Sequence, residues 1–251
     1  MVAQVQPNVL EAVLQDDYFS IEVSIREGYN AFVIEPSGMS IVEHAIASGN
    51  RNLLTTIVEN MHTVSNKDAY TLLSKAIDYK QIDMVKYLLG KNFHAEMNSV
   101  EMYNLVCLTL QHDYADIYRL FTEYSPAIDN HQMDFLSIAA NSDKFDIFSF
   151  IFKYKNLKTS EKLGSESLIH QAANSLPIIT FLINKGADVN ALTTNGHTPL
   201  HLTKDLKIAQ LLIKNGAIVN VEDNEGHTPL YYAQKAGDTA MVRLFERALE
   251  K

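Results

Sequence analysis

The stretch "GHTPLH" at residues 196–201 returns almost unchanged as "GHTPLY" at residues 226–231. A second phrase recurs at the same spacing, because Gly186 and Gly216 are 30 residues apart. Internal periods of about 33 residues are typical of solenoids, which are built from stacked helical hairpins. Neither phrase contains an arrangement of reactive side chains, so the repetition predicts an architectural role.

Each part of the repeated phrase has a physical role in such a hairpin. Thr198 and Thr228 can cap a first helix by accepting hydrogen bonds from its unpaired backbone N–H groups. Pro199 and Pro229 fall in the first helical turn, where no N–H donor is needed. Gly216 follows the second helix, where a left-handed residue is favoured. The phrase therefore predicts two helices with a capped start and a glycine stop.

These motifs resemble those of the ankyrin-repeat family, whose repeats read Gly-x-Thr-Pro-Leu-His-x-Ala-Ala, then a Val-x-x-Leu-Leu helix and Gly-Ala-Asp-x-Asn. The resemblance implies an all-α ankyrin-repeat solenoid of stacked helix-turn-helix units with short β-turn or hairpin-like connections. It is strong at residues 163–246, good at 38–60 and degenerate at 70–154. The degenerate part keeps the apolar spacing but lacks Pro, His and most glycines, so a helical hairpin of another kind remains open there.

The slot of Thr198 can be followed along most of the chain. At intervals of 30 to 33 residues it is occupied by Ser40, Thr71, Asn104, Asp134, Ser167, Thr198 and Thr228. We expect each of these residues to begin a first helix. The chain is therefore predicted to be a single ankyrin-repeat domain over residues 1–251, with an N-terminal capping repeat at about 8–37, six repeats at about 38–222 and a C-terminal capping repeat at about 223–251.

Two places depart from a regular repeat. The segment at residues 10–30 has the character of a helical hairpin, and its Gly28 lies where a second helix should end. The repeat that begins at Thr198 is three residues shorter than the usual unit, and the residues are missing between Leu202 and Ile208. This deletion predicts a clipped turn between the two helices of that repeat.

Composition excludes several classes of protein. The formal net charge is −9, which argues against nucleic acid as the main partner because phosphate binding needs a clustered basic surface. The single Cys107 excludes an internal disulfide framework and fits a reducing compartment. The longest apolar stretch, at residues 176–183, is too short to span a bilayer. The N-terminus has no basic start followed by a long apolar stretch, so we expect no secretory signal. We expect a monomer in the cytoplasm, or in a host cytosol if the protein is a secreted effector, without a membrane partner.

Three side chains are of types that can bind a metal or react. His170 and His201 share one slot in adjacent repeats, and the family resemblance implies that such a histidine tethers its own turn rather than binding a metal. Cys107 falls in the same slot of another repeat, within an apolar run that favours packing over reactivity. The sequence carries no phosphate-binding glycine loop and no catalytic motif. We therefore expect no enzyme activity, no cofactor and no metal.

The resemblance implies that a partner binds to the turn tips and to the exposed, concave face of the first helices. The matching positions predict the partner-binding residues Tyr70, Asp78, Tyr79, Tyr103, Gln111, His112, Met133 and Asn141. Five of them should lie side by side as an aromatic cluster, the kind of group that is enriched at the centres of interfaces: Tyr70, Tyr79, Tyr103, His112 and Met133. Internal packing of these aromatic side chains remains an open alternative.

The resemblance also implies a modification. In ankyrin repeats the asparagine that closes the Gly-Ala-Asp-x-Asn phrase can be hydroxylated, and here Asn190 and Asn220 occupy that position. Leu182 and Leu212 precede them by eight residues, as in the preferred substrates. Ile218 departs from the pattern where Asp188 follows it. A structural role, in which the asparagine bonds the backbone of the turn, is the alternative.

Together these observations predict a non-enzymatic protein-protein interaction scaffold. A composition with 16 Lys against 5 Arg, and with many Asn and Ile, suggests an AT-rich genome and so an effector of an intracellular bacterium. The alternative is a regulatory or targeting ankyrin segment of a larger enzyme.

Overall fold

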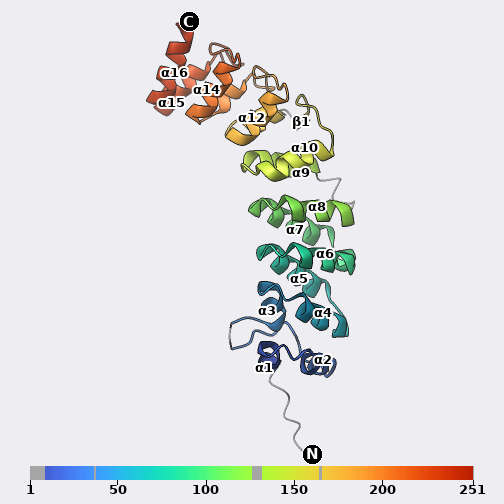
Figure 1. Cartoon of the computed structure of the whole chain (residues 1–251). Helices are drawn as coiled ribbons and strands as arrows, with labels where there is room; N and C mark the ends of the chain where they lie inside the picture. The colour runs from blue at the N-terminus through green and yellow to red at the C-terminus, as the bar shows by residue number, and fades with distance from the viewer. Residues whose placement is uncertain (1–8, 37, 126–131, 164–165, 251) are drawn as a thin grey trace, which may run out of the picture. The chain divides into compact units, whose positions relative to one another are not determined.

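The computed structural model describes residues 9–36, 38–125, 132–163 and 166–250. The chain divides into two compact units, Met1–Ile128 and Asp129–Lys251, and each is described by itself (Figure 1). The prediction of a single domain over residues 1–251 stays a prediction. In the described parts the chain is built almost entirely from paired helices, which confirms the expected all-α architecture of stacked helix-turn-helix units.

The first unit contains helical hairpins that follow one another along the chain. They are α1 (Val9–Leu14) with α2 (Tyr18–Arg26), α3 (Ile41–Ala47) with α4 (Arg51–Asn60), α5 (Asn66–Asp78) with α6 (Ile82–Gly90), and α7 (Ser99–His112) with α8 (Ala115–Tyr124). A short 3-10 helix, η1 (Phe93–Glu96), joins α6 to α7. Helical pairs thus occupy the degenerate stretch of this unit.

The second unit continues the pattern, and two of its first helices, α11 and α13, have only four residues. Its elements are α9 (Gln132–Asn141), α10 (Phe145–Tyr154), the antiparallel strands β1 (Lys162–Leu163) and β2 (Glu166–Ser167), α11 (Leu168–Gln171), α12 (Leu176–Asn184), α13 (Pro199–Leu202), α14 (Leu206–Lys214), α15 (Pro229–Ala236) and α16 (Thr239–Leu249). The two-residue strands are one of the hairpin-like connections that the sequence predicts. None of the helices in the described ranges has the length and apolarity needed to cross a membrane.

Stacking of the hairpins follows from where their apolar side chains lie. In α6 the buried residues are Met84, Val85, Leu88 and Leu89, a helical spacing that gives one apolar stripe. A single hairpin cannot cover such a stripe, so neighbouring hairpins cover it. Within the first unit α5 packs against α3 and α7, and α6 packs against α8; within the second, α12 packs against α10 and α14. Each fully buried leucine or valine stabilises this stack by about 1.5–3 kcal/mol.

The starts of the first helices correct part of the predicted register. Ser65 and Asn98 cap α5 and α7, each six residues before the predicted caps Thr71 and Asn104, which lie inside these helices. Asp134 likewise lies inside the first turn of α9. These repeats lack the Gly-x-Thr-Pro phrase that would stop the helix, so helix continues through the region where a turn tip was expected.

The last repeats follow the predicted register. Ser167, Thr198 and Thr228 are the N-cap residues of α11, α13 and α15, as expected. The clipped turn is also present, because α13 has four residues where α15 has eight.

The turn between the two helices of a hairpin uses a left-handed residue. Gly49 and Gly237 have φ angles of 70° and 71° at this point, immediately before the N-cap of α4 and α16. The corresponding residues of the other long hairpins are not glycine but have φ angles of 53° to 57°: Asp16, Lys80, Asp113 and Asp143. The geometry of the turn is therefore kept where the glycine is lost.

Candidate functional site

In the first unit, α3, α5 and α7 lie side by side, and their exposed side chains form one surface (Figure 1). We call this surface the first-helix face and define it by Glu43, Lys75, Asp78, Tyr79, Gln111 and His112. Glu43 belongs to α3, the next three residues belong to the C-terminal end of α5 and its cap, and the last two end α7. Successive repeats thus contribute neighbouring polar and aromatic groups.

One end of the first-helix face is organised around Glu43. The Lys75 ammonium lies 2.7 Å from Glu43 Oε1, and the Tyr79 hydroxyl donates to the same oxygen at 3.3 Å. The hydrogen bond to Glu43 raises the pKa of Lys75. Although they are paired, the side chains remain accessible, because Glu43 is 19% exposed and Tyr79 is 39% exposed. The pairing fixes the positions of groups that a partner can still reach.

The other end is organised around His112. Its Nε2 atom lies 3.7 Å from Asp78 Oδ1 on the neighbouring helix, and its ring stacks on Tyr114 with centroids 5.1 Å apart. The Lys80 ammonium lies 4.9 Å from the centroid of the Tyr114 ring, a cation–π contact. The imidazole is therefore held between a carboxylate and an aromatic ring at the surface.

The residues of the predicted aromatic cluster lie at two different levels along helices α5 and α7. Tyr70 and Tyr103 were expected at turn tips, but they lie within α5 and α7 and are half-buried. Tyr70 precedes Tyr79 by nine residues, and Tyr103 precedes His112 by nine residues. Nine residues correspond to a rise of roughly 13 Å along a helix. Tyr70 and Tyr103 therefore do not lie beside Tyr79 and His112, and the expectation that all these side chains lie side by side was wrong. Their role in binding stays a prediction.

The remaining predicted binding residues belong to the second unit. Met133 is half-buried in the first turn of α9. Asn141, at the end of α9, donates from Nδ2 to Gln171 Oε1 at 2.6 Å, and Gln171 donates from Nε2 to Glu166 Oε2 at 2.5 Å. Asn141 is exposed. It is thus part of a hydrogen-bonded row that runs from α9 to the neighbouring repeat.

His170 and His201 act as the predicted tethers. His201 Nδ1 accepts from the Thr198 backbone N–H at 3.0 Å, and its Nε2 lies 3.2 Å from the carbonyl oxygen of His227 in the next repeat. His170 repeats this arrangement with Ser167 on one side and with the carbonyl oxygens of Ala191 and His197 on the other. Burial lowers the pKa of both histidines. Each histidine therefore joins its own helix start to the following loop.

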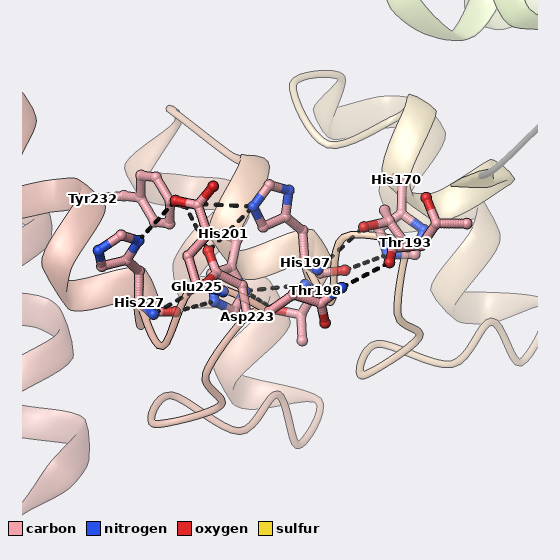
Figure 2. Close-up of polar contacts among 11 residues, drawn as sticks. His170, Thr193, His197, Thr198, His201, Asp223, Glu225, His227 and Tyr232 are labelled. Atoms are coloured by element: carbon pink, nitrogen blue, oxygen red, sulfur yellow. Dashed lines mark hydrogen bonds and ion pairs between the residues drawn. The ribbon is translucent and has the colours of Figure 1, made fainter.

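A second polar network closes the loop of the last repeat (Figure 2). Asp223 is buried and accepts hydrogen bonds from the Tyr232 hydroxyl at 2.6 Å and from the backbone N–H groups of Glu225 and His227 at 2.9 and 3.0 Å. His197 Nε2 lies 3.3 Å from Asp223 Oδ2, the oxygen that accepts from Tyr232. These hydrogen bonds lower the pKa of Asp223, and the same bond raises the pKa of Tyr232 to about 12. The network therefore holds the loop of the last repeat in place.

Sequence reasoning missed Asp223, Tyr232, Glu43 and Lys75. A signal existed for the first of these, because Asp223 precedes Gly226 by three residues as Thr193 precedes Gly196. Thr193 Oγ1 accepts from the His197 N–H at 3.1 Å, the bond that Asp223 makes to His227. The pairing of Glu43 with Lys75 crosses between repeats, so it has no local signal.

The remaining candidates for chemistry were the Cys107 thiol and a metal site. Cys107 is half-buried, and burial raises the pKa of its thiol, which agrees with a packing role. No group of three histidine, cysteine or acidic residues suited to a metal ion occurs in the described ranges.

The two candidate hydroxylation sites differ in their surroundings. Asn190 Nδ2 donates to the Gly216 carbonyl oxygen at 3.0 Å and its Oδ1 accepts from Ile218 N–H at 2.8 Å, so it links two repeats. Asn220 is exposed. Hydroxylation of either residue stays a prediction, which intact-mass measurement after co-expression with an asparaginyl hydroxylase would test.

Comparison with known proteins agrees with this architecture. Residues 167–249 match the family model for ankyrin repeats in three copies. The chain is 25% identical over 173 residues to an ankyrin repeat protein of Fowlpox virus (strain NVSL), covering 62% of this chain and 88% of that protein. It is 23% identical over 204 residues to an ankyrin repeat protein of Acanthamoeba polyphaga mimivirus, covering 78% of this chain and 27% of that one. The chain thus spans about a quarter of the mimivirus relative.

Proposed function

We propose that this chain, which belongs to the ankyrin-repeat family, is a non-enzymatic scaffold that binds a protein partner through the first-helix face. The single observation that carries the proposal is the state of Tyr79 and its neighbours. Glu43, Lys75 and Tyr79 hold one another in place from two repeats while they stay accessible. A surface that is ordered before binding loses less conformational entropy when the partner arrives.

The chemistry of the face suits a polar protein surface. It presents Tyr79 beside Glu43 and Lys75, and His112 beside Asp78. Tyrosine is enriched among the interface residues whose truncation to alanine weakens binding by about 2 kcal/mol or more. We further propose that the protein acts as a monomer in the cytoplasm and that neither nucleic acid nor membrane is its main partner.

The experiment is affinity capture from a eukaryotic lysate, followed by a titration with the captured partner. The Tyr79→Ala, His112→Ala double variant should weaken binding at least tenfold, since about 1.4 kcal/mol is a tenfold change. Both side chains are exposed, so the temperature of unfolding should change little.

A matched control removes one tyrosine and one histidine elsewhere. Tyr154 and His62 are also exposed and lie outside the first-helix face. The Tyr154→Ala, His62→Ala variant should bind as the unchanged chain does. Equal affinities for the face variant and the control variant would disprove the proposed surface. The Tyr70→Ala, Tyr103→Ala variant extends the test to the other end of α5 and α7.

A second candidate function is a regulatory or targeting ankyrin segment of a larger enzyme. It is favoured by the mimivirus relative, of which the match covers only 27%. Coding sequence beyond Lys251 that encodes a catalytic domain would support it. The bacterial-effector hypothesis rests on composition alone, and both relatives described above are viral.

A further inference from the structure

The deletion in the repeat that begins at Thr198 changes the surface beside the last repeat. In the last repeat the path from N-cap to second helix runs from Thr228 to Thr239, but in the clipped repeat it runs from Thr198 to Leu206, three residues fewer. As a result α13 ends after one turn, while the neighbouring α15 continues for another. The last turn of α15 therefore has no helical turn beside it in the preceding repeat.

A groove of about 500 Å³ lies at this place, between the clipped repeat and the α15–α16 hairpin. Its lining is mainly apolar and includes Leu200, Leu202, Pro229, Ala233, Met241 and Phe245. Met241 and Phe245 are only 3% and 1% exposed, so they form its floor. Ligand sites in proteins have volumes of about 300–1,000 Å³ and mostly apolar walls. The groove has the size and lining of such a site.

Two lysines line the groove, one from each of the two repeats that form it. Lys204 follows the short helix α13, and Lys235 lies in the last turn of α15. Both are exposed, and neither forms an ion pair with any residue in the described ranges. The Lys235 ammonium only approaches the Tyr231 ring, at 5.7 Å from its centroid. Their positive charges are thus open to a partner.

The acidic group of the lining is already engaged. Asp238 caps α16, where its Oδ1 accepts from the backbone N–H groups of Ala240 and Met241 at 3.1 and 3.0 Å. Its carboxylate is thus held at the start of α16. In a chain with a net charge of −9, this groove combines an apolar floor with a locally basic rim.

We propose that this groove binds a short acidic segment of a partner protein, whose large apolar side chains enter the groove while carboxylates pair with Lys204 and Lys235. The inference rests on the proposed function, because it names a contact of the same partner-binding scaffold. Apolar burial on the floor supplies affinity, and the ammonium groups fix the orientation of the segment and exclude basic ones. Two lysines, without an arginine or a third lysine in the lining, do not make a nucleic-acid site.

The test uses the full chain labelled with ¹³C at its methionine methyl groups and a synthetic peptide, Glu-Asp-Leu-Phe-Asp-Leu-Glu. The Met241 methyl signal should shift and saturate as peptide is added, because this side chain lies on the floor of the groove. The Met84 signal, from a buried residue of the first unit, should not move. Affinity should fall several-fold between about 50 and about 500 mM NaCl, since salt screens the lysine–carboxylate pairs. No shift at Met241 at millimolar peptide would overturn the inference.

Charge reversal separates specific binding from general stickiness. The Lys204→Glu, Lys235→Glu variant should bind the acidic peptide at least tenfold more weakly, and a peptide with lysine at each acidic position should bind this variant better than it binds the unchanged chain. The control variant Lys153→Glu, Lys214→Glu makes the same charge change at exposed lysines in the last turns of α10 and α14. It should stay within about twofold of the unchanged chain. An acidic peptide that binds both variants alike would refute the proposed contact.

A third variant tests the origin of the groove. Insertion of Ala-Ala-Gln between Leu202 and Thr203 restores the missing residues, lengthens α13 and should abolish peptide binding. If the insertion variant does not fold, the lysine variants still decide the matter. The outcome is separable from that of the proposed function. If partner capture depends on the first-helix face but the peptide does not bind, only the groove proposal is disproved. If the peptide binds but capture does not depend on that face, only the first-helix face is disproved.

Discussion

The backbone of Gly196 packs so closely against Asn224 of the next repeat that a Cβ atom on Gly196 would lie 2.9 Å from the Asn224 nitrogen. Two hydrogen bonds hold the loops in this position. The Asn224 backbone N–H donates to the Asn195 carbonyl oxygen at 3.0 Å, and Asn224 Nδ2 donates to the Thr194 carbonyl oxygen at 2.9 Å. The equivalent Gly226 has nothing within 4 Å of a Cβ atom added to it. The same glycine thus has two different roles.

This difference predicts unequal effects of one substitution. Gly226→Ala should lower the free energy of unfolding by about 1 kcal/mol, since alanine is strained at a φ of 80°. Gly196→Ala has a similar φ of 78° but also forces two backbones apart, and we expect a loss of about 3 kcal/mol. Urea unfolding followed by circular dichroism measures both values. Equal losses for the two variants would contradict the close packing of the loops.

The caps of the degenerate repeats lead to a second prediction. Ser65 and Asp68 form a capping box at the start of α5, with the Asp68 N–H 3.2 Å from Ser65 Oγ and the Ser65 N–H 3.1 Å from Asp68 Oδ2. Ser65→Ala should therefore lower the free energy of unfolding by about 1 kcal/mol. Thr71, which the register of the repeats assigned to the cap, only donates to the Lys67 carbonyl oxygen inside the helix.

The matched control for this prediction is Thr71→Ala. Alanine favours the helix more than threonine does, so the change should stay within about 0.5 kcal/mol of zero. Thermal unfolding of both variants under one buffer condition gives the comparison. A larger loss for Thr71→Ala than for Ser65→Ala would return the helix start to the position expected from the repeat.

How much the sequence predicts depends on the local signal in each repeat. Thr198 and Thr228 were placed correctly because each stands directly before a proline in a repeated phrase. The starts of α5 and α7 were placed six residues too late, because the counting of a period ignores local capping signals such as "SNKD" at residues 65–68. Periodicity finds the apolar stripe of a helix but not its ends.

The candidate site shows the same limit. Tyr79 and His112 were predicted from the register and lie exposed on the first-helix face. Glu43 and Lys75, which organise that face, were not predicted. Their contact depends on how one hairpin stacks on the next, and a distance between repeats is not encoded in either local segment.

A third prediction concerns the residue that ends α10. Asn156 has a φ of 50°, at the position where Gly186 and Gly216 follow α12 and α14. Its side chain is exposed. Asn156→Gly should raise the free energy of unfolding by about 0.5 kcal/mol, and Asn156→Ala should lower it by about 1 kcal/mol, because the left-handed conformation disfavours a Cβ atom. Chemical unfolding of the pair gives the answer, and equal stabilities for Gly and Ala would contradict the assigned backbone conformation.

The tethering histidines make stability depend on pH. Burial lowers the pKa of His170 and His201 below their usual value of 6.5. The hydrogen bonds to backbone carbonyl oxygens, and then the nearby carboxylates, offset this only in part. Between the folded and the unfolded pKa the unfolded chain binds more protons than the folded one. The stability that the neutral histidines contribute is therefore complete above pH 6.5 and is lost as the pH falls toward the folded-state pKa.

The fourth prediction gives this effect a size and a control. As the pH falls below 6.5, the free energy of unfolding should decrease by up to about 1.4 kcal/mol per pH unit for each of the two histidines. Replacement of both by glutamine should lower stability at pH 7.5, because the bonds to the next loop are lost, but it should flatten the slope between pH 6.5 and 5. Urea unfolding at several pH values measures both slopes. If the unchanged chain and the double variant lose stability equally over this range, protonation of His170 and His201 does not control the acid sensitivity.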